Sequence, residues 1–222
     1  MLRLFRSREL NKKINDGCKR PYDLGKRSET MDRNRAALLN AAREELEANG
    51  LANFTVEALA RKAGLSRQTA HNLFGTKGGI LEALFDDLAK KGGLTRMPEI
   101  MQESSAKRML AEFVRVFTDF WASDRVLIRR IHGIAVIDPE LGASVQARNE
   151  RRKRAARRVV ERLGTGNDAE KTRLAATLYA MTSFEFFDAL FNEDIQKEAA
   201  WKQLWQVVQR ALALDPGDDV GG

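Results

Sequence analysis

Residues 64–80, GLSRQTAHNLFGTKGGI, contain two sets of side chains that could bind a phosphate group or a nucleic acid. The first is the glycine cluster from Gly75 to Gly79, which surrounds Lys77 and has the composition of a phosphate-binding loop. Such a loop lies between a buried strand and a helix, and serine or threonine follows its lysine. Here Gly78 follows Lys77, and the residues before the cluster have the pattern of a helix. The sequence therefore argues against a nucleotide site.

The second set lies on a helix expected over residues 67–74, after a turn at Gly64-Leu65 and a candidate N-cap at Ser66. Polar side chains at positions i, i+1, i+4 and i+5 share one face of that helix. They are Arg67, Gln68, His71 and Asn72. The major groove of DNA admits a helix, and side chains of these types hydrogen-bond to base edges there. We therefore expect this face to read DNA.

Three hydroxyl residues are expected near helix starts in the same region. Thr55, Ser66 and Thr69 are first of all cap or turn residues. A hydroxyl at a helix N-terminus can also face a DNA phosphate, so we include all three in the predicted DNA-binding surface.

Helical periodicity continues along the chain, and no segment alternates with period two for long enough to form a strand, so we predict an all-α fold. The expected helices cover 33–49, 56–63, 67–74, 80–91, 106–122, 124–136, 140–163, 168–192 and 196–214. A linker rich in Gly, Pro and Ser follows residue 91. It separates a helix-turn-helix domain at 32–90 from a helical bundle within 91–214. Residues 1–31 are expected to form a flexible basic arm and residues 215–222 a disordered tail.

The charge of the chain favours a polyanionic partner. The formal net charge is +7 and the pI about 9.7. Residues 1–30 carry nine Lys or Arg against four Asp or Glu, so most of the excess lies there. Two interpretations of this arm stay open: a genuine arm, which could insert into a DNA groove, or an extension upstream of a true start at Met31.

Several classes of protein do not fit the composition. Cys18 is the lone cysteine and the histidines are only His71 and His132, so neither an internal disulfide nor a thiolate or imidazole metal site is expected. No nucleophile and base are spaced for catalysis, no cofactor is expected, and no apolar run approaches the ~20 residues of a membrane span. We therefore expect a cytoplasmic protein that is not an enzyme.

Residues 33–90 resemble the DNA-binding domain of the TetR/AcrR family of bacterial transcriptional regulators. The resemblance rests on Phe-Thr-Val-Glu at 54–57, Leu-Ala-Arg-Lys-Ala-Gly-Leu-Ser at 59–66 and Phe-Gly-Thr-Lys at 74–77, in that order. It implies a homodimer that binds a palindromic operator on double-stranded DNA, a phosphate contact for Lys77, and a second domain that binds a small effector and dimerises. Repression is the family default. His71 stands where the family usually has an aromatic residue, and Gly78-Gly79 predict a loose junction before the fourth helix.

The second half of the chain resembles the family's effector domain only in its number of helices and in an Arg-rich helix. Its apolar faces predict a pocket for an apolar or amphipathic effector. The candidate lining residues are Phe113, Phe117, Phe120, Trp121, Ile131, His132, Met181, Phe184 and Glu185. An apolar stripe on the last helix predicts the dimer interface, formed together with 168–192. It consists of Trp201, Leu204, Trp205, Val208 and Leu212.

Some alternatives remain open at this point. The basic run from Arg148 to Arg162 is interpreted as a solvated helix face, although a second nucleic-acid surface or a clamp for an acidic effector would also fit. For the whole chain, the alternatives to a regulator are a non-specific architectural DNA-binding protein and, less favoured, a helical enzyme.

Overall fold

The computed structural model describes residues 24–164, 166–191 and 196–213, and this part of the chain is built from helices without a strand. The helices are α1 (Leu24–Asn49), α2 (Val56–Lys62), α3 (Arg67–Phe74), α4 (Lys77–Lys91), α5 (Met97–Ile100), α6 (Ala106–Ser123), α7 (Arg125–Ala135), α8 (Pro139–Leu163), α9 (Asp168–Met181), α10 (Phe184–Leu190) and α11 (Lys197–Ala211), with the short 3-10 helix η1 (Leu94–Arg96) before α5. None of these helices is long and apolar enough to cross a membrane. The all-α prediction is confirmed for the described residues.

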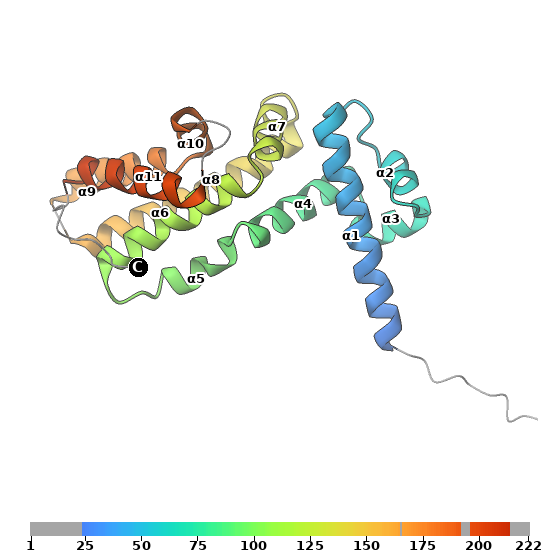
Figure 1. Cartoon of the computed structure of the whole chain (residues 1–222), viewed down its shortest axis with the longest axis horizontal. Helices are drawn as coiled ribbons and strands as arrows, with labels where there is room; N and C mark the ends of the chain where they lie inside the picture. Colours follow the sequence, from blue (N-terminus) through green and yellow to red (C-terminus); the bar gives the residue numbers. More distant parts are fainter. Residues whose placement is uncertain (1–23, 165, 192–195, 214–222) are drawn as a thin grey trace, which may run out of the picture.

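Two bodies lie at opposite ends of the molecule, and α4 runs from one to the other (Figure 1). Helices α1 to α3 form the smaller body, around the buried side chains of Leu38, Leu46, Phe54 and Leu59. Helix α6 lies inside the larger body, where one broad apolar face is buried against α8 and α11. Helix α7 packs beside the C-terminal part of α1, so the two bodies also touch away from α4.

Side-chain caps set the starts of the helices in the smaller body. Thr55 Oγ1 accepts the Ala58 N–H at 3.1 Å, and Ser66 Oγ accepts the Thr69 N–H at 3.0 Å. Each cap satisfies one of the N–H groups that have no partner within the helix. Gly64 has φ +68°, a left-handed conformation that favours glycine, and it turns the chain between α2 and α3. The expected caps at Thr55 and Ser66 and the bounds of α3 are confirmed.

Some expected helix boundaries are wrong. Helix α1 begins at Leu24, so the last part of the expected arm, 24–31, is helical, while residues 1–23 lie outside the described residues. Gly25 falls in the first turn, where the backbone N–H groups have no partner within the helix in any case. The expected helix 168–192 is divided at Thr182, because the Ser183 hydroxyl accepts the Phe186 N–H at 3.1 Å and starts α10.

The glycine pair at the start of α4 forms a close contact with its neighbours, and the expected looseness of the junction stays a prediction. Thr76 caps α4, which begins at Lys77 instead of residue 80. A Cβ atom at Gly78 would overlap the Glu140 carboxylate of α8, and one at Gly79 would overlap the backbone carbonyl of Phe74. The absence of side chains at these two positions lets α4 approach both neighbours.

Replacing Gly79 by alanine should destabilise the protein, because the methyl group meets backbone, which cannot rotate away. We expect a loss of about 1–3 kcal/mol in the free energy of unfolding. Gly133 is the matched control, since it is helical and a Cβ there meets open space. Gly133→Ala should be stabilising by about 0.5–1 kcal/mol. Thermal denaturation of both variants tests this, and equal melting temperatures would contradict it.

Candidate DNA-binding surface and ligand pocket

Helices α2 and α3 form a helix-turn-helix in which the predicted polar face of α3 points to solvent. Arg67, Gln68, His71 and Asn72 are all exposed, whereas Ala70 on the opposite face is fully buried. The core contact through Ala70 fixes the rotation of α3 about its axis. The four polar side chains are thereby held on the outside of the domain.

The exposed side chains of α3 hydrogen-bond to one another and to α2. Gln68 Nε2 donates to Asn72 Oδ1 at 2.8 Å, one helical turn apart, and Arg67 Nε lies 2.6 Å from Glu57 Oε1. Side-chain amides pair with adenine in the major groove and arginine pairs with guanine. This face therefore carries side chains of the types that can discriminate base pairs, and hydrogen bonds hold two of them together.

The hydroxyl residues are used within the protein. Thr55 and Ser66 cap α2 and α3, and Thr69 is half-buried with its Oγ1 2.8 Å from Ser66 Oγ. An oxygen that accepts one N–H can still donate its own proton, so contacts from these residues to phosphates remain a prediction.

Lys77 faces the larger body in this structure. Its Nζ lies 3.2 Å from Asp138 Oδ2, at the start of α8. Asp138 also caps α8, because its Oδ1 accepts the Leu141 N–H at 3.0 Å. These two contacts, the Leu141 hydrogen bond first and Lys77 after it, hold the pKa of the Asp138 carboxyl below its usual value. The expected phosphate contact of Lys77 thus competes with an ion pair between the two bodies.

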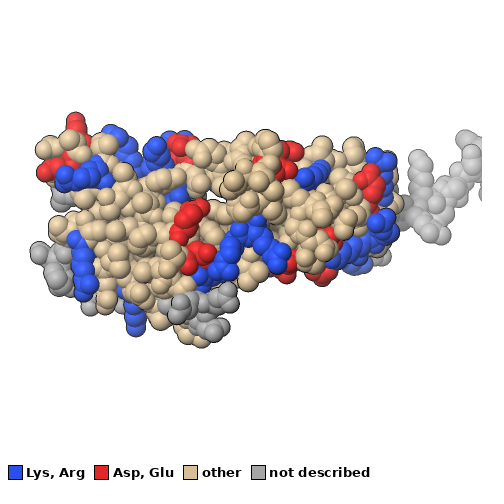
Figure 2. All heavy atoms as spheres, turned by 90° about the horizontal axis from the view of Figure 1, so that it is seen from above, with Lys and Arg blue, Asp and Glu red and all other residues tan. Residues whose placement is uncertain are grey.

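Acidic and basic side chains are mixed over the face that Figure 2 shows, including the end formed by α1 to α3. Near α3, Arg67 pairs with Glu57, and Lys62 lies within 3.5 Å of Glu44 and Glu45. Acidic neighbours thus offset the basic side chains near α3, and the predicted DNA-binding face is mainly polar instead of strongly basic.

A pocket of about 330 Å³ lies in the larger body, between α4, α6, α7 and α8. Four of the predicted lining residues do line it: Phe117, Phe120, Trp121 and His132. The remaining expected residues do not: Phe113, Ile131, Met181, Phe184 and Glu185. Phe113 and Ile131 are core residues with almost no exposed surface. The sequence therefore predicted part of the apolar floor of the pocket. Helical periodicity identifies buried faces, but it does not distinguish residues that line a pocket from residues of the core.

Two of the misplaced residues support the pocket wall from behind. The Phe184 ring packs on Trp121 and on His132, with centroids 5.6 and 4.8 Å apart. Glu185 Oε1 lies 2.9 Å from His132 Nδ1, and this hydrogen bond is the main reason why the pKa of Glu185 is lowered to about 2. The His132 ring is thus fixed by contacts on both sides.

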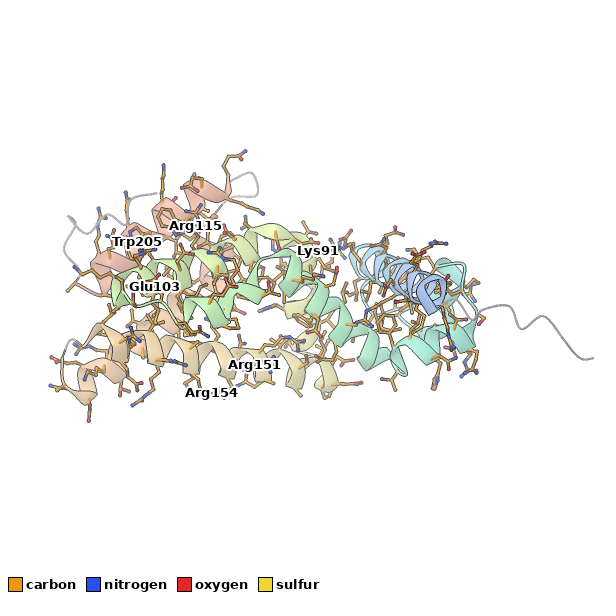
Figure 3. The ribbon with its side chains drawn as sticks, turned by 90° about the horizontal axis from the view of Figure 1, so that it is seen from below. Lys91, Glu103, Arg115, Arg151, Arg154 and Trp205 are labelled. Atoms are coloured by element: carbon orange, nitrogen blue, oxygen red, sulfur yellow. The ribbon has the colours of Figure 1, made fainter. Side chains whose placement is uncertain are left out.

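The polar wall of the pocket belongs to α8 and lies in the run that was interpreted mainly as a solvated face, with a clamp for an acidic effector as one open alternative. Arg148, Asn149, Arg151 and Arg152 all line the cavity, and Asp86 of α4 is its one lining acid among the described residues. The interpretation of the whole run 148–162 as a solvated face is wrong for Arg152, which is only 5% exposed. Neighbouring Arg154 does face solvent (Figure 3). A run of arginines contains no signal for which of them points inward, because helical rotation relative to the bundle decides it.

The apolar stripe on α11 is covered within the subunit, so its assignment to a dimer interface is wrong for most of its residues. Leu204, Trp205, Val208 and Leu212 are buried, chiefly against α6. Trp201 remains partly exposed, stacked on Trp205 and beneath the Arg115 guanidinium. Figure 3 labels Arg115 and Trp205 on this side of the bundle. A stripe of this width looks the same in sequence whether it packs on its own chain or on another.

The fold and the α3 face define a DNA-binding protein with a helical second domain. Residues 38–84 match the family of bacterial regulatory proteins named tetR. Among curated proteins, none matches the sequence. The DNA-binding domain belongs to the TetR family, and the chain is a DNA-binding transcriptional regulator.

Solved structures with this fold cover most of the chain at low sequence identity. A transcriptional regulator from Aquifex aeolicus has TM-score 0.62 and 13% identity, over 80% of this chain and 99% of its own. The TetR-family regulator PfmR from Thermus thermophilus has TM-score 0.59 and 18% identity, over 79% and 95%. A regulator from Saccharomonospora viridis, solved in complex with choline, has TM-score 0.58 and 17% identity, over 82% and 96%. These likenesses extend the shared fold beyond the DNA-binding domain.

The competition at Lys77 can be tested with a pair of variants. Lys77→Ala should weaken binding to every DNA sequence alike and reduce the salt slope by about one unit, if the ammonium contacts a phosphate. Asp138→Asn retains an N-cap but removes the competing charge. It should bind DNA at least as tightly as the unmodified protein. Fluorescence anisotropy over a salt series measures the DNA affinity of both variants and its salt dependence. An unchanged slope in Lys77→Ala would show that Lys77 makes no phosphate contact and only binds α8.

Proposed function

We propose that this regulator binds a palindromic operator as a homodimer and that a small molecule in the pocket of the larger body changes its affinity for DNA, with release of DNA as the response. The observation that carries the DNA-binding part is the exposed face of α3, with Arg67, Gln68, His71 and Asn72 together on one side of a capped helix. A two-fold dimer places two such faces about 34–36 Å apart, or a multiple of that distance.

The pocket supports the effector part of the proposal. Its volume of about 330 Å³ and its aromatic floor are typical of sites for small ligands. One protein with the same fold was solved with choline bound, so this architecture can hold a small molecule. An effector acts only if it binds two arrangements of the protein unequally.

The route from pocket to DNA in this proposal is the contact between α4 and α8. Pocket residues Phe85 and Ala89 belong to α4, and the pocket arginines belong to α8. The first turn of α8 meets the first turn of α4 at Lys77 and Gly78, directly after the DNA-reading helix. A ligand that moves α8 relative to α4 would therefore tilt α3, and in a dimer it would change the separation of the two reading faces.

Selection from random double-stranded DNA should return an inverted repeat. Asn72→Ala should then relax preference at particular base pairs and cost about 1–3 kcal/mol in binding. Gln102→Ala, at an exposed position after α5 and outside the proposed dimer contact, is the matched control and should leave the selected sequence unchanged. Recovery of no preferred sequence would instead favour a non-specific architectural role.

The homodimer should be visible by light scattering at micromolar concentration. Because the α11 stripe is buried, we assign the two-fold contact to the outward sides of α9 and α11, and on α9 this side exposes Ala176 and Ala180. Ala176→Arg should shift the protein toward a monomer, through bulk and charge repeated across the two-fold axis. Ala36→Arg, on an exposed face of α1, should not. A monomer for the unmodified chain would contradict the proposal.

A further inference from the structure

The pocket wall contains a buried cation that forms no ion pair within the described part of the chain. This cation is Arg152, which is 5% exposed. Its partners are neutral: Nη1 donates to the Tyr179 carbonyl and lies 3.3 Å from Thr182 Oγ1, and Nη2 lies 3.2 Å from Asn149 Oδ1. Buried charges in proteins are ordinarily paired, because an uncompensated one is costly.

One polar atom of this guanidinium has no partner among the described residues. Arg152 Nε is buried and, in this part of the chain, forms no hydrogen bond. The group lies 4.1 Å from the centroid of the Tyr179 ring and 5.8 Å from that of Phe117, a pocket residue. Burial is the main reason why the pKa of Arg152 is lowered from its usual value. The nearby Glu185, which opposes this effect only at a distance, is already bound to His132.

The other charged side chains of the pocket also leave an excess of positive charge. Arg148 is paired with Glu82 at 2.8 Å and with the pocket acid Asp86 at 3.1 Å. Arg151 is exposed at the rim and, among the described residues, forms no ion pair. Figure 3 labels it on α8. Two of the three pocket arginines thus lack a carboxylate, beside a floor made by Phe117, Phe120 and Trp121.

We propose that the effector is an anionic amphiphile, a carboxylate joined to an apolar group, whose carboxylate pairs with Arg152 and whose apolar part lies on the aromatic floor. This rests on the proposed function, since it names the chemistry of the ligand in the same pocket. An arginine and a carboxylate form charge-assisted hydrogen bonds, and the charge of Arg152 in the pocket wall favours one there. Arg151 at the rim adds attraction for an entering anion.

Arg152 also has a structural contact, which the experiment must separate from ligand binding. Its hydrogen bond to the Tyr179 carbonyl lies at the C-terminal end of α9, where a cation is favourable. Arg152→Gln keeps an amide donor for that carbonyl and removes the charge, and Arg152→Lys keeps the charge and removes the planar fork. Arg154→Gln, on the exposed side of the same helix, is the matched control. Thermal melts identify any variant that does not fold.

Titration calorimetry of the full chain with octanoate, octanamide and octylammonium tests the charge preference. The unmodified protein should bind octanoate about tenfold or more tighter than octanamide, and octylammonium most weakly. The preference should persist in Arg152→Lys and Arg154→Gln, and fall to within about twofold in Arg152→Gln. Equal binding of the three probes, no binding of octanoate, or a preference unchanged in Arg152→Gln would overturn the proposal.

Operator binding in the presence of octanoate distinguishes this inference from the proposed function. Carboxylate preference with release of DNA supports both. Carboxylate preference without any change in DNA affinity supports the anion site and contradicts the effector role. Specific operator binding by a protein that has no carboxylate preference leaves DNA recognition intact and overturns the anion site alone.

Discussion

The close approach of α4 to α3 and α8 is the constraint on which the arrangement of the two bodies depends. Glycine at 78 and 79 lets the first turn of α4 pack against the Glu140 carboxylate and under the carbonyl of Phe74. The contact of α4 with α3 is thus made to backbone, whereas its contact with α8 is made to the side chains of Glu140 and Asp138. Close-packed contacts of this kind transmit small displacements, because they do not deform gradually. Composition alone describes these glycines by the freedom of their backbone, and in the folded chain they form a close contact between α4 and its two neighbours.

Helix α8 contributes residues both to the junction with α4 and to the pocket. Its first turn provides Asp138 and Glu140 to the junction, and its middle turns provide Arg148 and Arg152 to the pocket. Arg148 additionally reaches α4, through Glu82, Asp86 and the Phe85 ring at 4.5 Å. A ligand anion near Arg152 would thus act on a helix already tied to α4 by ion pairs and by stacking. In such an arrangement α8 itself would connect the pocket to the start of α4, which directly follows α3 in the chain.

The sequence predicts the smaller body far better than the larger one, for a physical reason. Caps at Thr55 and Ser66, the left-handed Gly64 and the polar face of α3 depend on interactions within a few residues, and the structure confirms these local features. Features of the larger body depend on which faces of distant helices meet. Periodicity identifies α11 as amphipathic but does not say that α6 covers its stripe, and it identifies an Arg-rich α8 but does not reveal that Arg152 points inward. The break at Thr182 was hidden because both flanking segments are helical and apolar. The glycine pair shows the same limit, since composition reports freedom of the backbone and only the fold reports what occupies the space.

The distribution of charge separates affinity from specificity in this chain. The described face of α3 has one arginine, Arg67, and it is paired with Glu57, so amides and an imidazole dominate the groups available to bases. The strong excess of positive charge lies instead before residue 31. Attraction to phosphates is insensitive to sequence and falls with salt, whereas readout by amides requires exact placement of α3 in the groove. A ligand that alters the geometry of two reading faces would therefore remove the specific part of DNA binding and leave the general attraction almost unchanged. Release from an operator under such control is a transfer to weaker, non-specific DNA contacts, and its extent depends on how much of the total affinity the α3 faces supply.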